Sequence, residues 1–160
     1  MCSSDLLVVC HLGGGCSVTA VKDGRSVDTT MGLTPLEGVP MVTRSGSLDP
    51  GALLYLLRSG RTVDELEHAL NEESGLTAMG GLDEPFVVGY FAYHVAKAVA
   101  AMAAVLGGVD VIAFSGGIGE HREDVRNAIA ERVAFLAARV HVVPAHEELV
   151  IARHVERLLA

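Results

Sequence analysis

Two glycine-rich segments each follow a short apolar run, and together they could hold a phosphate group. The first, His11-Leu12-Gly13-Gly14-Gly15, follows the apolar run 7–10, and the second, residues 116–120, follows the run 109–114. Glycine lets the backbone approach a phosphate closely, and successive N–H groups can point at its oxygens. The helix predicted after the second segment adds N-terminal N–H groups that favour an anion. Glycines that only form tight turns remain the alternative.

Charged residues outside these segments could complete such a site. Arg44 lies in the loop segment Thr43-Arg44-Ser45-Gly46, which offers no obvious carboxylate partner, and a guanidinium there suits a phosphoryl anion. Glu147 and Glu148 follow Pro144 at the expected start of a helix. Carboxylates at a helix start are stabilised by the helix dipole, but one of them could hold Mg²⁺ through water, since Mg²⁺ uses few protein ligands. A solvated arginine and a dipole-stabilising glutamate remain the alternatives.

The glycine segments match no standard nucleotide or hydrolase fingerprint. The pattern G-x-x-x-x-G-K-[ST] is absent, both segments lack the third glycine of the dinucleotide pattern, and the chain has no G-x-S-x-G. The seven histidines are scattered, and the three cysteines lack the spacing of a tetrahedral metal site. The prediction of a phosphate site therefore depends on the two segments together.

The composition indicates a globular chain with its own core. The chain has 160 residues, of which 50% are hydrophobic, and its formal net charge is −8. A domain of this length buries roughly two-thirds of its unfolded surface, and the apolar content excludes intrinsic disorder. An acidic chain without Lys/Arg runs repels phosphate backbones and anionic lipids, so we expect no nucleic-acid and no membrane partner. The odd cysteine count without C-x-x-C fits a reducing, cytoplasmic location.

Strand and helix signals alternate along the chain and predict an α/β fold. Asp23-Gly24 lies between two alternating runs and predicts a hairpin, while Asp49-Pro50 and Thr62-x-x-Glu65 predict helix starts. The apolar run 86–106 carries His94 and Lys97 near its middle, which favours a buried helix over a membrane span. The expected strands are residues 7–10, 17–21, 25–30, 109–114 and 140–143, and the expected helices are 50–59, 63–73, 86–106, 124–138 and 147–159.

Five blocks of sequence resemble the acetate kinases, and they occur in the order seen in that family. They are His11-Leu12-Gly13-x-Gly15-x-Ser17, MGLTPLEG at 31–38, Thr43-Arg44-Ser45-Gly46, SGGIGE at 115–120 and EELVIAR at 147–153. The resemblance implies the fold of the acetate and sugar kinase/Hsc70/actin superfamily. This is an α/β, ribonuclease H-like (actin-like ATPase) domain, with a mixed sheet, an N-terminal β-hairpin and flanking helices.

The resemblance also implies an activity and a set of site residues. ATP and acetate would give ADP and acetyl phosphate by direct in-line transfer, with Mg²⁺ or Mn²⁺. Arg44 matches the arginine that stabilises the transferring phosphoryl group, and Glu147 matches the glutamate of the magnesium site. The nucleotide would lie against His11, Leu12, Gly13, Gly14 and Gly15 on the phosphate side and against Gly117, Ile118, Gly119, Glu120 and His121 on the nucleoside side.

The chain departs from the family pattern in several places. Gly14 and His121 each stand where the family has an asparagine, and the segments before Phe86 and before the strand ending at Val143 are shorter than in the family. The match begins in the middle of the family. Residues 7–160 are therefore expected to be the C-terminal nucleotide-binding domain of an enzyme whose N-terminal domain is missing. Residues 1–6 do not match the family strand and are expected to be a non-native leader.

These departures limit what we expect of the chain alone. Phosphoryl transfer needs groups that act as a unit, so we expect the isolated chain to be inactive. The resemblance implies a homodimer for the full-length form. Two alternatives stay open: a fragment of a butyrate or propionate kinase, and a non-catalytic module for nucleotide binding or dimerisation.

Overall fold

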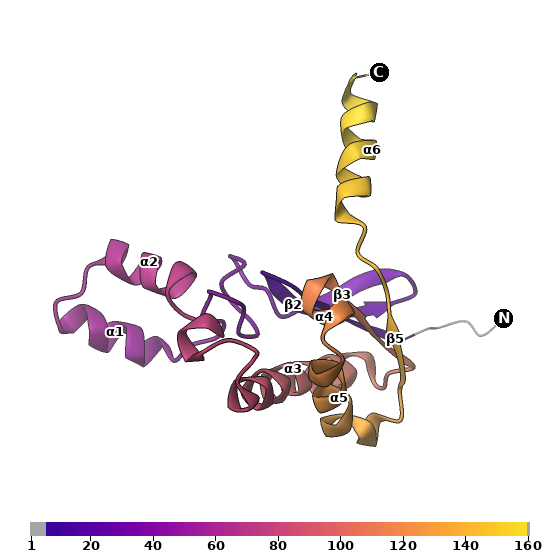
Figure 1. Cartoon of the computed structure of the whole chain (residues 1–160), viewed down its shortest axis with the longest axis horizontal. Helices are drawn as coiled ribbons and strands as arrows, with labels where there is room; N and C mark the ends of the chain where they lie inside the picture. Colours follow the sequence, from indigo (N-terminus) through magenta and orange to yellow (C-terminus); the bar gives the residue numbers. More distant parts are fainter. Residues whose placement is uncertain (1–5, 160) are drawn as a thin grey trace.

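The computed structural model describes residues 6–159, apart from the side chain of Glu147. Its centre is a five-stranded sheet of strand order β3-β2-β1-β4-β5 (Figure 1). The strands are β1 (Leu7–Leu12), β2 (Cys16–Lys22), β3 (Arg25–Thr29), β4 (Val111–Ser115) and β5 (Arg139–Val142). The first three are antiparallel, whereas β4 runs parallel to β1 and β5 parallel to β4. The sheet is therefore mixed, as predicted.

The predicted hairpin joins β2 and β3. Asp23 and Gly24 have φ angles of 51° and 73°, which is the left-handed conformation that the tightest hairpin turns require. The expected antiparallel meander at the N-terminus is confirmed. His11 and Leu12 extend β1 instead of belonging to the glycine loop, because they pair with Ser17 and Cys16 of β2.

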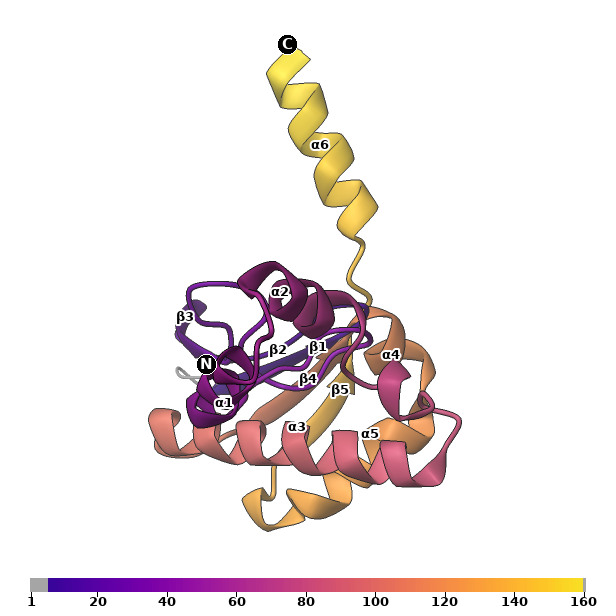
Figure 2. The same cartoon turned by 90° about the vertical axis from the view of Figure 1, so that its left-hand side faces the viewer.

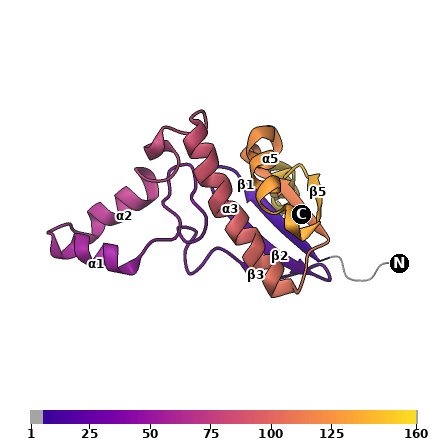
Figure 3. The same ribbon diagram turned by 90° about the horizontal axis from the view of Figure 1, so that it is seen from below.

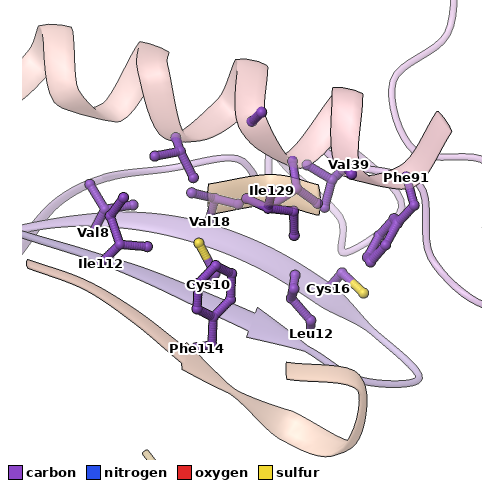
Figure 4. Packing of buried hydrophobic residues seen from close by; sticks show 14 of the residues in the cluster. Val8, Cys10, Leu12, Cys16, Val18, Val39, Phe91, Ile112, Phe114 and Ile129 are labelled. Atoms are coloured by element: carbon purple, nitrogen blue, oxygen red, sulfur yellow. The ribbon is translucent and has the colours of Figure 1, made fainter. Parts of the chain in front are cut away.

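Helices α3 (Pro85–Leu106) and α5 (Glu123–Arg132) lie on one face of the sheet (Figures 2 and 3). Alternate residues of β1 face these helices, so that Val8, Cys10 and Leu12 are fully buried together with Phe91 of α3 (Figure 4). Helix α3 is long and apolar enough to cross a membrane. Here nine of its residues are buried in the core, which confirms the expectation of a buried helix.

Helices α1 (Pro50–Arg58) and α2 (Val63–Glu72) form a hairpin that extends away from the sheet (Figures 1 and 3). Both begin where the sequence predicts. The Asp49 carboxylate accepts from the Gly51 N–H at 2.8 Å, while the Thr62 hydroxyl and the Glu65 carboxylate cap each other's backbone N–H groups. A short 3₁₀ turn, η1 (Thr77–Met79), follows this hairpin and leads towards α3.

Two predictions about the second half of the chain were wrong. Residues 116–121 form a short helix, α4 (Gly116–His121), and not a glycine loop, because Gly116 has a φ of 78° and turns the chain directly out of β4. Helix α5 ends at Arg132 instead of residue 138. A 3₁₀ turn, η2 (Ala134–Leu136), and Ala137 with a φ of 52° then reverse the chain so that it can enter β5 parallel to β4.

The last helix, α6 (Glu147–Leu159), projects away from the rest of the fold (Figures 1 and 2). All side chains from residue 148 to 159 are exposed. At the other end of the chain, the Leu6 N–H donates to the Asp110 carboxylate at 2.8 Å, and its carbonyl accepts from the Asp110 N–H. The remainder of the predicted leader, residues 1–5, lies outside the described residues.

Candidate functional site

A cleft of about 520 Å³ opens where β1 and β4 end side by side. His11 and Ser115 are register partners in these parallel strands, so the segments that follow them leave the sheet at the same edge. The cleft is lined by both glycine segments and by the chain that enters α6. Its lining residues are His11, Gly13, Gly14, Gly15, Gly116, Gly117, Glu120, Ala145, His146, Glu148 and Leu149.

The two glycine segments contact each other through their backbones. A methyl group at Gly116 would lie 2.7 Å from the Leu12 carbonyl oxygen, and one at Gly13 would lie 3.8 Å from the Gly117 nitrogen. Methyl groups at Gly14 and Gly117, by contrast, would meet no heavy atom within 4 Å. Glycine is thus needed at Gly116 for close contact, whereas Gly14 and Gly117 leave open space in which a ligand can approach the backbone.

The His11 ring lies between the two segments. Its Cε1 atom is 3.2 Å from the position of a methyl group on Gly116, and its Nε2 atom is 3.8 Å from that of a methyl group on Gly13. Because alternate residues of a strand point to opposite faces, His11 faces away from the side of β1 that buries Cys10 and Leu12. The ring therefore belongs to the cleft wall and not to the core.

Arg44 reaches the first glycine segment from a distant loop. Its Nη1 atom lies 3.5 Å from the position of a methyl group on Gly15, and the Val42 N–H donates to the Gly14 carbonyl at 3.4 Å. The same Nη1 contacts the Met41 sulfur at 3.9 Å. Among the described residues, no carboxylate forms an ion pair with Arg44. Its charge is thus available to an anion beside the glycine loop.

Glu120 holds two walls of the cleft together. Its Oε1 accepts from the Gly116 N–H and from the Ala145 N–H, both at 3.0 Å. The carboxylate therefore joins the start of α4 to the segment that enters α6. Arg126, from α5, supports the same helix by donating to the Gly119 and Glu120 carbonyls at 3.0 and 2.9 Å.

The remaining residues predicted for the nucleoside side are placed differently. Gly119 is buried against the ends of β1 and β4, Ile118 packs against the core, and the exposed His121 does not line the cleft. Leu12 is fully buried in the core. The side chain of Glu147 lies outside the described residues, while Glu148 beside it lines the cleft. The assignments of these residues to nucleotide and metal stay predictions.

Residues 82–83, just before α3, bind Arg122 at the junction between α4 and α5. The Arg122 guanidinium donates to the Leu82 carbonyl and pairs with Asp83 and Asp124 at 3.4 and 2.9 Å. The hydrogen bonds that Arg122 donates to Asp124 hold the pKa of Asp124 below its ordinary value, and the same bonds raise the pKa of Arg122. This is the region where the resemblance implies a segment shorter than in the acetate kinases.

One buried thiol supports the first glycine loop. The Cys16 Sγ donates to the Gly13 carbonyl at 3.4 Å. Burial raises the pKa of this thiol to about 11, so it stays protonated and keeps its donor at neutral pH. Among the described side chains of residues 6–159, which do not include that of Glu147, no group of three or more His, Cys, Asp or Glu is placed to enclose a metal ion.

Sequence reasoning missed several lining residues, because they meet the glycine segments only in the folded chain. Ala145, His146 and Leu149 lie more than twenty residues after the second glycine segment and carry no phosphate-binding pattern. Arg126 was missed as well, although a basic residue one turn into the helix after the glycines is a signal that could have found it.

The mixed sheet, its helices and the cleft at the strand ends define the class: this is an actin-like ATPase domain of the ribonuclease H-like fold, as predicted. The family follows from sequence. Residues 3–151 match the model of the acetokinase family, and the chain belongs to that family.

Curated relatives support the same assignment. The chain is 43% identical to the acetate kinase of Acaryochloris marina over 152 residues, covering 85% of this chain and 38% of that enzyme. It is 36% identical to the acetate kinase of Clostridium beijerinckii over 200 aligned positions, covering 98% of this chain and 50% of that enzyme. The chain thus spans about half the length, or less, of the relatives it matches. The second alignment is longer than this chain, so that relative holds residues that this chain lacks.

Solved structures agree with the fold. The crystal structure of Porphyromonas gingivalis acetate kinase superimposes with a TM-score of 0.85 and 28% identity, covering 98% of this chain and 49% of that one. A propionate kinase from Francisella tularensis superimposes with a TM-score of 0.84 and 33% identity, covering 95% of this chain and 49% of that one. Both cover nearly all of this chain, so the cleft forms within a fold that these enzymes share.

Proposed function

We propose that this chain is the nucleotide-binding half of an acetate kinase, which transfers a phosphoryl group between ATP and acetate. One observation carries the proposal: the backbones of the two glycine segments meet at the ends of β1 and β4, with the Arg44 guanidinium beside Gly15. Phosphoryl transfer is mainly positioning and charge stabilisation, so exposed N–H groups and a cation at one place suit it. Family membership supports this assignment.

In this proposal the first glycine segment binds the phosphates of ATP or ADP, and the second lies on the nucleoside side. The space around Gly14 leaves its backbone accessible to phosphate oxygens, and the space around Gly117 leaves room for the nucleoside. Arg44 then stabilises the negative charge on the phosphoryl group as it passes between nucleotide and acetate. Because Arg44 has no ion-pair partner among the described residues, this charge need not be released from a competing carboxylate first.

The acidic residues at the start of α6 fit a magnesium ion. Mg²⁺ takes one or two carboxylates together with phosphate oxygens and water, so the lack of a larger acidic cluster does not conflict with it. We assign Glu147 as the principal ligand and note that Glu148, its neighbour, lines the cleft. When bound, Mg²⁺ (or Mn²⁺) would neutralise charge on the nucleotide phosphates.

In this proposal the whole reaction requires more protein than these 160 residues, because the chain spans half or less of the length of the relatives it matches. We propose that residues 7–160 form the nucleotide-binding domain, and that the half of the relatives that this chain does not match supplies the rest of the acetate site. The complete enzyme would be a cytoplasmic homodimer. Propionate as the acceptor is the second candidate, because the propionate kinase of F. tularensis superimposes as closely as the acetate kinase of P. gingivalis.

Calorimetric titration of the chain with ATP tests the nucleotide assignment. We expect binding that needs Mg²⁺ and that is weakened by Glu147→Ala, with Glu156→Ala on the exposed part of α6 as the matched control. Loss of binding in both variants, or unchanged binding in Glu147→Ala, would contradict the metal assignment. A wild-type chain that binds no ATP at all would contradict the proposed function.

A chimera tests the transfer reaction itself. The part of the A. marina enzyme that this chain does not match is joined to the chain, and acyl phosphate is trapped with hydroxylamine. We expect acetyl phosphate from the chimera, and none from the 160-residue chain alone. Acyl-phosphate formation by the isolated chain would contradict the proposal that both halves of the enzyme are needed for the transfer.

A further inference from the structure

The loop that carries Arg44 is held in place by a separate segment, residues 70–77, which comprises the last turn of α2 and the chain that follows it. The Ser74, Leu76 and Thr77 N–H groups donate to the carbonyls of Thr43, Met41 and Val42 at 3.0, 2.9 and 2.9 Å. In the opposite direction, the Ser45 N–H donates to the Leu70 carbonyl at 3.0 Å. Backbone bonds on both sides of Arg44 thus fix the loop to this one segment.

A side-chain bond adds to this attachment. The Thr43 hydroxyl donates to the Asn71 carbonyl at 2.8 Å in a partly buried position. The loop also closes on itself, because the Met41 N–H donates to the Arg44 carbonyl at 3.0 Å. Arg44 therefore has little freedom in its backbone, although its guanidinium has no carboxylate partner among the described residues.

Gly75 is the closest contact in this arrangement. A methyl group at this position would lie 2.3 Å from the Met41 carbonyl oxygen and 2.7 and 2.9 Å from the backbone oxygen and nitrogen of Arg44. These are backbone atoms, which cannot turn aside as the end of a flexible side chain can. Gly75 also has a φ of 66°, in the left-handed region. No other residue type allows the 70–77 segment to lie this close to Arg44.

We propose that Gly75 is a positioning residue that sets where the Arg44 guanidinium lies, and that the Thr43 hydroxyl is a second point of attachment between the loop and the same segment. The consequence for phosphoryl transfer rests on the proposed function, whereas the attachment itself does not. Displacing a catalytic group by about 1 Å can cost on the order of 100-fold in rate. A loop pushed back by a methyl group at Gly75 would move Arg44 by an amount of this order, while the glycine segments that bind the nucleotide stay in place.

Hydrogen exchange of the 160-residue chain tests the attachment. The pair to compare is Gly75→Ala and Gly24→Ala, because the two glycines have φ angles of 66° and 73°, but a methyl group at Gly24 would meet nothing within 4 Å. We expect at least tenfold faster exchange of the Ser45, Leu76 and Thr77 amides in Gly75→Ala. In Gly24→Ala these three amides should exchange as in the wild type. Unchanged protection in Gly75→Ala would overturn the proposal.

A ligand pair tests the effect on Arg44. Mg·ADP probes the ground state, and Mg·ADP with aluminium fluoride, which mimics the transferring phosphoryl group, probes the contact with Arg44. We expect Gly75→Ala and Arg44→Ala to lose at least tenfold in affinity for the mimic and less than threefold for Mg·ADP. Faster exchange in Gly75→Ala with full affinity for the mimic would overturn the positioning role.

Thr43 variants keep the test valid if Gly75→Ala does not fold. Thr43→Val removes the hydroxyl with little change of shape, and Thr43→Ser keeps the hydroxyl as the conservative rescue. We expect Thr43→Val to lose affinity for the mimic and Thr43→Ser to retain it. Equal behaviour of the two would overturn the proposal. A wild-type chain that fails to bind Mg·ADP would contradict the proposed function instead, and the exchange experiment would still decide the attachment.

Discussion

Removing the Glu120 carboxylate should loosen the cleft wall by an amount that its two hydrogen bonds determine. Oε1 accepts from the Gly116 and Ala145 N–H groups, both at 3.0 Å. A hydrogen bond to a charged group contributes roughly 1.5–3 kcal/mol. Because Glu120 is only partly buried, water can replace part of what is lost. We therefore expect Glu120→Ala to lower the free energy of unfolding by about 2–3 kcal/mol in total.

The variant Glu120→Gln distinguishes the effect of the hydrogen-bond acceptor from the effect of the negative charge. In Glu120→Gln an amide oxygen can still accept both N–H groups, so the loss should be less than about 1 kcal/mol. Urea unfolding followed by far-UV circular dichroism measures both variants. Glu131→Ala is the matched control, since Glu131 is an exposed helical glutamate of α5 whose side chain forms no hydrogen bond or ion pair among the described residues.

Local opening should accompany the global loss. Among the described residues the Ala145 N–H donates only to Glu120, so its exchange should accelerate in Glu120→Ala and not in Glu131→Ala. The reasoning is refuted if Glu120→Ala unfolds at the same urea concentration as the control. It is refuted equally if Glu120→Gln is as destabilising as Glu120→Ala, because keeping an oxygen that accepts from Gly116 and Ala145 would then preserve no stability.

Three further perturbations have defined outcomes. Gly116→Ala should cost about 1–3 kcal/mol more than Gly107→Ala in urea unfolding, because the φ angles match (78° and 76°) but only Gly116 abuts Leu12. Burial raises the pKa of the Cys16 thiol from 9.0 to about 11, so the stability that the buried, protonated thiol contributes is complete below pH 9 and is lost as the pH rises to 11. Cys16→Ala should therefore lose less stability than the wild type between pH 8 and pH 10.5 in the same urea measurement. Arg44→Lys should bind the aluminium fluoride complex of Mg·ADP more weakly than the wild type, by calorimetry, since an ammonium lacks the planar guanidinium fork.

Local signals in the sequence predict much of the fold. The Asp23-Gly24 turn, the Asp49 cap and the Thr62–Glu65 capping box each act over four residues or fewer, and the structure contains all three. The end of α5 was missed for the opposite reason. Helix-forming residues continue to residue 138, but the chain must reverse after Arg132 to enter β5 beside β4. There the packing of β5 beside β4 outweighs the helix propensity of residues 133–138.

The candidate site, like the fold, was predicted from the sequence only where local patterns mark its residues. Glycine clusters at strand ends and a loop arginine are visible in the sequence, and the structure brings Arg44 to Gly15. The lining residues Ala145, His146 and Leu149 and the bond from Glu120 to Ala145 connect segments about twenty-five residues apart, and no local pattern encodes them. Gly75 likewise looks like an ordinary loop glycine until the fold sets it against the backbone of Arg44.

The central claim is that the cleft between the two glycine segments binds nucleotide phosphates. Amide chemical-shift mapping of the ¹⁵N-labelled chain during titration with Mg·ADP tests it most directly, because each glycine of the cleft reports separately. We predict the largest shifts at Gly13, Gly14, Gly15, Gly117 and Ala145, with the hairpin turn at Gly24 unchanged. Shifts confined to another surface, such as the apolar groove between α1 and α2, would contradict the claim, as would a spectrum that Mg·ADP leaves unchanged.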